Sequence, residues 1–431
     1  MFDAVIHSGN PYTMMSAIRA GKLSLGIIGA SIAQNGGCYD PLKRCWSFSG
    51  FANTRRQIYD TDHVWKSTKD KHEGFIVRFS NMIARDFNTK ITIHNAALDA
   101  TPIHAILDCF HTYIPPHLDA VIIEPGSMAK YTNGNKLRQV VQQIRSMTRI
   151  PHMIFILFHE WVRYKNHEFY KFDENTPWQQ MENAALQICM ETNSTCISPR
   201  RELYHTVDAY TIHNFVGKDG LHIVNSRNGT EYVFNILAKW MREVSVRKHE
   251  PPAINRLPPA TSPAACFKFS HKPRRFKMIE WITSDCYNCS KVKKRESCNY
   301  LSKHWTFCEY TNKNKFNISK HSPAIVSTNP GSELVIDVDT SSFSQPVIVV
   351  EYLTSYENIG FVNYKCIRGC ACDDGIINGV RRYNYNSIYE RYNIHTYKKE
   401  DLCKIKFILG GTINSLFRIR WIFVLNQNYT Y

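Results

Sequence analysis

The first part of the chain alternates between apolar runs of strand length and segments whose apolar residues have helical spacing. Four segments are predicted strands: Leu23–Ile28, Lys90–His94, Ala120–Glu124 and Met153–Phe158. Four are predicted helices: Gly74–Phe87, Thr101–His111, Lys136–Met147 and Thr176–Glu191. Helices between successive strands indicate parallel pairing. This part is therefore predicted to be an α/β domain, a three-layer sandwich around a parallel sheet.

Polar and small residues follow several of these predicted strands directly. Ser31, Asp99 and Gly126 each lie just beyond a strand end. In sheets of this kind, functional sites collect outside the carboxyl ends of the strands. We therefore expect these three positions to lie at one edge of the sheet.

The pattern changes after a proline-rich segment, HEPPAINRLPPATSPAA at 249–265. Such composition is typical of a stiff, extended connector. Beyond it, short runs rich in β-branched and aromatic residues are punctuated by Gly, Asn and Asp. These runs predict an antiparallel β domain of sandwich type. The predicted organisation is an α/β domain at 1–248, a linker at 249–265 and a cysteine-rich β domain at 266–431.

The net charge is more informative about possible binding partners than the overall composition is. The formal charge of +16 favours acidic partners. No nucleic-acid module is recognisable, so nucleic acid is not the expected partner. An acidic polysaccharide is one candidate, and a basic surface without a specific polyanion is the alternative. No apolar run has the length of a transmembrane segment.

Fourteen cysteines are unevenly distributed, with nine between Cys266 and Cys403. This clustering predicts a disulfide-braced second domain and an oxidising compartment, the secretory lumen or the extracellular space. Five N-glycosylation triplets agree with that expectation, although Met1 to Arg19 lack the layout of a signal peptide. The triplets begin at Asn193, Asn228, Asn288, Asn317 and Asn428.

Some of the cysteines also admit another interpretation. Cys286-x-x-Cys289 with Cys298 and Cys308 could hold zinc, but the spacing fits no familiar finger and disulfides are favoured. Cys366, Cys370, Cys372 and Cys403 are predicted to form crosslinks between loops and strands, with a pairing that the sequence does not determine. No metal or cofactor is expected to be needed.

Two segments carry candidate chemistry for nucleophilic catalysis. IIGASIAQNGGC places Ser31 directly after an apolar strand and a small turn. A serine hydroxyl is a poor nucleophile without a neighbouring base and a group that orients that base. KDGLHIVNSRNG supplies Asp219 and His222, three residues apart, ahead of an amphipathic helix. We predict Ser31 as nucleophile, His222 as base and Asp219 as the orienting acid.

These segments resemble the motif blocks of SGNH (GDSL-like) hydrolases, and the chain is similar to a two-domain group of that class seen in algae. The resemblance runs through IIGASIAQNGGC, HNAALDATP, LDAVIIEPGSMA and KDGLHIVNSRNG in the first domain. In the second domain it covers PGSELVIDV, VEYLTSYENIGFVNYKCIRGCACD and DLCKIKFIL. It implies a flavodoxin-like fold and a serine esterase in which Ser31, Asp219 and His222 are catalytic.

The resemblance also implies an oxyanion hole, and the chain departs from the family's pattern there. The backbone N–H groups of Ser31 and Ala100 match two donors of the class. Met128 stands where the class has an asparagine, and Ala30 stands where it has an aspartate. Ser127 or Asn95 could replace the missing donor. Loss of one donor costs about a hundred- to a thousandfold in rate.

Two functions follow from the sequence as hypotheses. The first is hydrolysis or transfer of a small, O-acetyl-like acyl group on a glycan or another small ester. The second is a catalytically impaired relative that binds a glycan or a cell-surface partner.

Overall fold

The computed structural model describes residues 4–34, 58–60, 74–98, 101–107, 110, 114–162, 168–208, 211–217, 219–252, 257–258, 265–268, 305–313, 319–341, 343–355, 359–381, 388–412 and 415–427. Contacts divide the chain into two compact units. The first unit contains Met1–Thr261 and Lys313–Ser319, and the second contains Ser262–Asn312 and Lys320–Tyr431.

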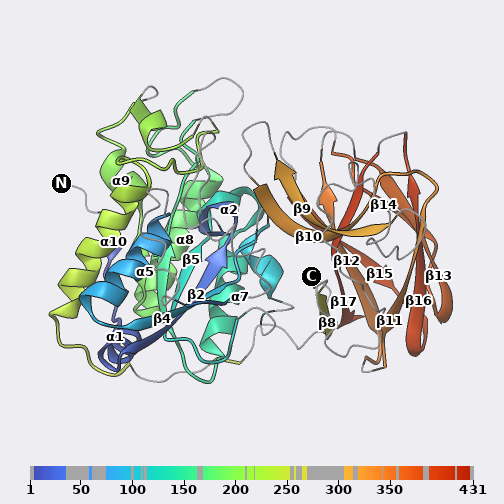
Figure 1. The fold of residues 1–431 in the computed structure, drawn as a ribbon, viewed down its shortest axis with the longest axis horizontal. Helices are drawn as coiled ribbons and strands as arrows, with labels where there is room; N and C mark the ends of the chain where they lie inside the picture. The colour runs from blue at the N-terminus through green and yellow to red at the C-terminus, as the bar shows by residue number, and fades with distance from the viewer. Residues whose placement is uncertain are drawn as a thin grey trace, which may run out of the picture. The chain divides into compact units, whose positions relative to one another are not determined.

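The first unit is built around one seven-stranded sheet (Figure 1). Its strands are β1 (Val5–His7), β2 (Lys22–Gly29), β3 (Ile58–Asp60), β4 (Lys90–Asn95), β5 (Ala120–Glu124), β6 (His152–Ile156) and β7 (Thr195–Ile197). They lie in the order β1-β7-β6-β5-β2-β4-β3. The five inner strands are parallel, and their order matches the flavodoxin-like pattern 2-1-3-4-5.

Helices cover both faces of this sheet. They are α1 (Tyr12–Arg19), α2 (Ser31–Gln34), α5 (Phe75–Asp86), α7 (Gly134–Arg145), α8 (Pro177–Thr192), α9 (Pro199–Leu203) and α10 (Thr230–Ser245). Three 3-10 helices add to them: η1 (Ile103–Ile106), η2 (Gly126–Tyr131) and η3 (Thr211–Asn214). Buried residues of α1, α5 and α10 form one core cluster with the sheet, while α7 and α8 pack against each other on the opposite face (Figure 1).

The predicted α/β sandwich is confirmed, and the two edges of its sheet add a feature that the sequence pattern did not indicate. β1 pairs with β7, and β3 with β4, in the antiparallel direction. Each edge strand has three residues, which is too short to show a period of two. The helix expected at Thr101–His111 begins as the short turn η1 after Pro102, and Phe110 is again helical, while Asp108, Cys109 and His111 lie outside the described residues.

The second unit contains two antiparallel sheets of a sandwich-like β domain, as expected. One sheet has the order β15-β12-β17-β10-β9, with β8 also paired to β17; the other has the order β11-β16-β13-β14. Their bounds are β8 (Ala265–Lys268), β9 (Thr306–Lys313), β10 (Ser319–Ser327), β11 (Glu333–Asp339), β12 (Pro346–Thr354), β13 (Phe361–Ala371), β14 (Gly375–Asn378), β15 (Ile388–His395), β16 (Lys398–Gly410) and β17 (Phe417–Asn426).

One apolar cluster joins these two sheets. Residues from both contribute to it, including Val350 and Phe417 from the first sheet and Leu334, Val362 and Phe407 from the second. All five are buried. The alternating in-and-out pattern of the strands therefore produces one core between two layers.

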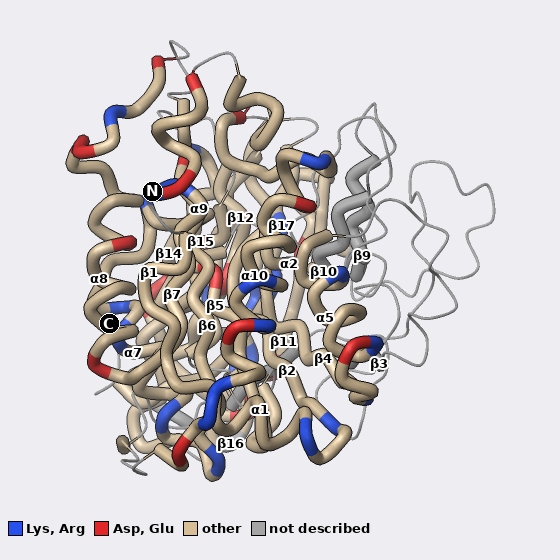
Figure 2. Tube along the Cα trace, turned by 90° about the vertical axis from the view of Figure 1, so that its left-hand side faces the viewer, with Lys and Arg blue, Asp and Glu red and all other residues tan. Residues whose placement is uncertain are grey.

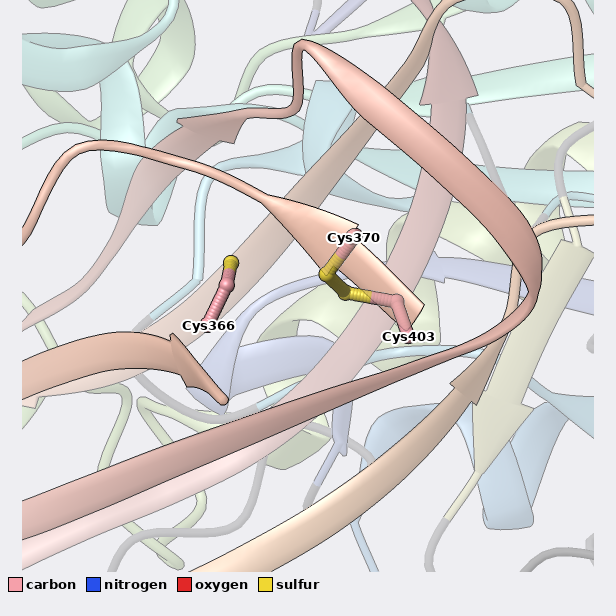
Figure 3. Close-up of side chains that lie close together, drawn as sticks. All are labelled: Cys366, Cys370 and Cys403. Carbon is pink, nitrogen blue, oxygen red and sulfur yellow. A yellow bond between two sulfur atoms is a disulfide. The ribbon is translucent and has the colours of Figure 1, made fainter. Parts of the chain in front are cut away.

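Disulfides brace the second sheet of this unit. Cys366 pairs with Cys372, and Cys370 pairs with Cys403, which links β13 to β16. Figure 3 shows the Cys370–Cys403 bond with Cys366 beside it. The expected crosslinks at these four cysteines are confirmed. In the first unit, a disulfide between Cys189 and Cys196 joins α8 to β7.

The disulfides Cys366–Cys372 and Cys370–Cys403 are expected to contribute unequally to stability. Their sequence separations are 33 residues for Cys370–Cys403 and 6 residues for Cys366–Cys372. In the chain-entropy model, the longer loop gives about 4 kcal/mol and the shorter about 2 kcal/mol. Denaturant unfolding of the two paired Cys→Ser variants should show this difference. Equal losses would contradict an origin in loop closure.

Candidate active site

The candidate site lies where the strand order of the first sheet reverses. β2 is the central strand, with β4 on one side and β5 on the other. The chain winds outward in both directions from β2, and ligands of such folds bind beyond the carboxyl ends of the strands at this reversal. Ser31 follows β2, and the turn Pro125–Gly126 follows β5.

The nucleophile candidate occupies a tight connection between strand and helix. β2 ends at Gly29, and α2 begins at Ser31. A Cβ at Gly29 would lie 2.6 Å from the Cβ of Ala33 and 2.9 Å from the Cβ of Glu124, so a side chain does not fit there. The Ser31 side chain is mostly enclosed, with 7% of the residue exposed.

The side chain of His222 lies between those of Ser31 and Asp219, within hydrogen-bond distance of each. The Ser31 Oγ is 2.6 Å from His222 Nε2. His222 Nδ1 is 2.6 Å from Asp219 Oδ2. The other oxygen of Asp219 accepts hydrogen bonds from the backbone N–H groups of Leu221 and His222, both at 3.0 Å. The predicted nucleophile, base and acid are thus brought together from distant parts of the chain.

Backbone contacts hold the loop that carries Asp219 and His222. Gly220 has a φ of +71°, and a Cβ there would lie 3.1 Å from the backbone N and O of Val162. Its carbonyl accepts a hydrogen bond from the N–H of Trp161, at 2.8 Å. Below the loop, Phe215 and Ile223 are buried in the core of the first unit. These contacts therefore fix the backbone that carries the imidazole of His222.

The electrostatics of the loop favour a charged acid beside the imidazole. Burial acts to raise the pKa of Asp219, but the His222 charge and the hydrogen bonds from His222 and Leu221 outweigh it. The net result lowers this pKa to about 2. Asp219 is therefore an anion throughout the neutral range, and it can stabilise an imidazolium at His222.

The predicted oxyanion donors are only partly described. Ala100 lies outside the described residues. Met128 lies in η2, beyond β5, with 8% of the residue exposed and a side chain that cannot donate a hydrogen bond. The Ser127 hydroxyl donates to Glu124 Oε2 at 2.5 Å, so its single hydrogen is already engaged. Asn95 Oδ1 accepts from the N–H of Ala97.

Two carboxyl groups near this edge were missed by sequence reasoning. Glu124, at the end of β5, is 1% exposed and lies opposite Gly29 in the sheet register. Glu182, on α8, accepts hydrogen bonds from His159, Ser198 and Arg201. A glutamate inside a run of buried apolar residues, as in AVIIE, was the available sign for Glu124.

Potential metal ligands also come together in the second unit. Among the described residues, one group of potential ligands is close enough, the sulfurs of Cys366, Cys370 and Cys403, which lie within 4.8 Å of one another (Figure 3). Each of these cysteines forms a disulfide in the structure. Cys286, Cys289 and Cys298, considered earlier for zinc, lie outside the described residues.

Positions of both charge signs are interspersed along the described chain, where Figure 2 colours Lys and Arg blue and Asp and Glu red. Part of the positive excess lies in the undescribed segment 269–304, which has nine Lys and Arg against three Asp and Glu, a net +6. Among the helices that the structure describes, none has both the length and the apolar character needed to cross a membrane.

Comparisons with known proteins show what the fold resembles. No family model matches the sequence, and no curated protein matches it. The structure is similar to a two-domain esterase, CEX, active on acetylated mannans, at 13% identity and a TM-score of 0.57. The match covers 97% of this chain and 96% of that protein. The same esterase co-crystallised with mannopentaose matches with the same coverage and identity and a TM-score of 0.56.

At this identity, the similarity shows a shared fold that includes both domains. An α/β domain with a flavodoxin-like sheet is followed by an antiparallel β domain in the same chain. This two-domain fold is the one found in an esterase of known structure.

Proposed function

We propose that the chain is a serine ester hydrolase or acyl transferase of SGNH type, acting on a small acyl group, O-acetyl or similar, carried by a glycan or another small ester. One observation carries this proposal, the contact of 2.6 Å between Ser31 Oγ and His222 Nε2, with Asp219 on the opposite nitrogen. The fold shared with an esterase active on acetylated mannans supports it.

The proposed reaction has two acyl-transfer steps. Ser31 Oγ attacks the carbonyl carbon of the ester while His222 Nε2 takes the hydroxyl proton. The tetrahedral intermediate collapses, and His222 returns the proton to the leaving alcohol. Water, or an acceptor hydroxyl in a transferase, then attacks the acyl carbon while His222 takes its proton. The bond from the acyl carbon to Ser31 Oγ breaks, and His222 returns the proton to Ser31 Oγ. Asp219 stabilises the imidazolium formed in each step.

The proposed oxyanion hole uses backbone donors. The N–H groups of Ser31 and Ala100 would bind the developing negative charge. Because Met128 offers no third donor and the Ser127 hydroxyl is engaged by Glu124, turnover is expected to be slow for the class. A single missing donor accounts for about a hundred- to a thousandfold in rate.

Release of acetate from two acetylated polysaccharides and one small ester tests this proposal. Acetate release is measured from acetylated mannan, from an acetylated acidic polysaccharide and from p-nitrophenyl acetate. The protein is expected to release acetate from at least one of them, and Ser31→Ala from none. Release that is equal in the wild type and in Ser31→Ala would overturn the proposal.

A second candidate function, glycan binding without catalysis, is favoured by one observation, the apolar Met128 at a donor position. It predicts retention of the protein on a polysaccharide column with no acyl release. The net charge of +16 favours an acidic polysaccharide in either case. The disulfides of both units favour a secretory or extracellular location.

A further inference from the structure

The turn that carries Ser31 is connected to the next turn along the sheet by one buried carboxyl group. Glu124 Oε2 accepts a hydrogen bond from the N–H of Ala30 at 3.4 Å. The same oxygen accepts from the Ser127 hydroxyl at 2.5 Å, and Oε1 accepts from the Ser127 N–H at 2.7 Å. The carboxyl group therefore joins the turn after β2 to the turn after β5.

These two turns are the ones on which the proposed chemistry depends. Ala30 directly precedes Ser31, and Ser127 directly precedes Met128. A buried carboxylate that accepts three hydrogen bonds fixes the backbone far more tightly than solvent would. Glu124 is 1% exposed and both of its carboxyl oxygens accept hydrogen bonds, so the position of the carboxyl group is well defined.

We infer that Glu124 is a positioning residue of the proposed active site, which holds the Ser31 turn against the turn after β5 and places a second carboxylate near the imidazole of His222. This inference rests on the proposed function. Asp219 contacts the imidazole directly, whereas Glu124 acts through the Ala30 and Ser127 backbone and through its charge.

The ionisation of Glu124 supports this role. Burial raises its pKa to about 7, against the opposing effects of the hydrogen bonds from Ser127 and Ala30 and of the His222 charge. The groups that face it are His222 on the loop before α10, Ser127 on η2 and Ala30 beyond β2. The ionised carboxylate accepts these three hydrogen bonds more strongly than the neutral acid does, so the link between the two turns strengthens as pH rises through the neutral range.

Glu124→Gln is the variant that tests the inference. An amide keeps the size of the side chain but has one oxygen acceptor, so a donor of one of the two turns loses its partner. Hydrolysis of p-nitrophenyl acetate is followed from pH 5 to 9 for the wild type and the variant. We expect kcat to fall about 10- to 100-fold with little change in KM, because the reacting atoms are misplaced while binding is retained.

The pH profile separates positioning from a general loss of structure. The acid limb of the wild-type pH profile should include the ionisation of Glu124. The acid limb of the Glu124→Gln profile should lack that ionisation. Glu351→Gln is the matched control, because Glu351 is also 1% exposed but binds Arg420 in the second unit. Its profile should follow that of the wild type. A Glu124→Gln profile with wild-type shape and kcat would overturn the inference.

Ser127→Ala keeps the inference testable if Glu124→Gln does not fold. This variant removes one hydrogen bond to the carboxylate and leaves the backbone N–H in place, so the acid limb should move to higher pH. An unmoved limb would overturn the inference while leaving the proposed function intact. A folded wild type with no activity on any ester would overturn the proposed function, and this inference with it.

Discussion

Replacement of His222 by glutamine is expected to lower kcat/KM for p-nitrophenyl acetate by about 10⁴-fold or more. Ser31 Oγ is 2.6 Å from His222 Nε2, so this imidazole is the base placed to take the serine proton. Without the imidazole, the serine proton has no acceptor during attack, and the leaving alcohol has no donor. The measurement is steady-state kinetics at neutral pH.

A matched histidine variant distinguishes this effect from a change of charge or fold. His117 is exposed and lies in the loop before β5. His117→Gln should therefore keep wild-type kinetics. If His222→Gln retained more than about a tenth of the wild-type activity while His117→Gln behaved as the wild type, general-base catalysis by His222 would be contradicted.

Asp219→Asn is expected to reduce kcat by about 10⁴-fold, with the fold preserved. The carboxylate accepts at Oδ2 from His222 Nδ1, which leaves Nε2 free to accept the serine proton. An asparagine side chain can donate its amide hydrogen to Nδ1 instead, and this stabilises the wrong tautomer of the imidazole. The loss should appear in kcat more than in KM, since Asp219 does not touch the substrate in this account.

The pH dependence of the wild type adds a second check on Asp219. Its folded pKa, about 2, lies below the unfolded value, so its contribution to stability is present above pH 4 and is lost as pH falls through 2. Asp219→Asn should lose that contribution at neutral pH and converge with the wild type in acid. Asp337→Asn is the control, because Asp337 has similar exposure, at 37%, and pairs with Lys404 in the second unit.

Much of the fold was predictable because its strands and helices have strong patterns. The run at Ala120–Glu124 matches β5, and Thr176 caps α8 through a hydrogen bond to the Gln179 N–H, as Thr176 and Pro177 suggested. The second domain was harder, because β8, β9, β10, β14 and β15 were not predicted. β14 has four residues and β15 is rich in Tyr and Asn, so both show little alternation.

The candidate site was predictable in its direct chemistry and not in its supporting groups. Ser31, Asp219 and His222 have local signatures, a turn after a strand and an Asp-x-x-His spacing. For Glu124 the one local sign is a glutamate in the apolar run AVIIE, and its role depends on register, which places it opposite Gly29, and on hydrogen bonds from Ala30 and Ser127. Such relations exist only once β2 and β5 are paired.

The central claim is that Ser31 is a nucleophile activated by His222. Mass spectrometry of the protein after treatment with a fluorophosphonate tests it most directly, because the adduct marks the reactive serine without any assumption about the substrate. One adduct is expected, on Ser31, and it should be absent from His222→Gln. An adduct on a different serine, or equal labelling of Ser31 in His222→Gln, would contradict it.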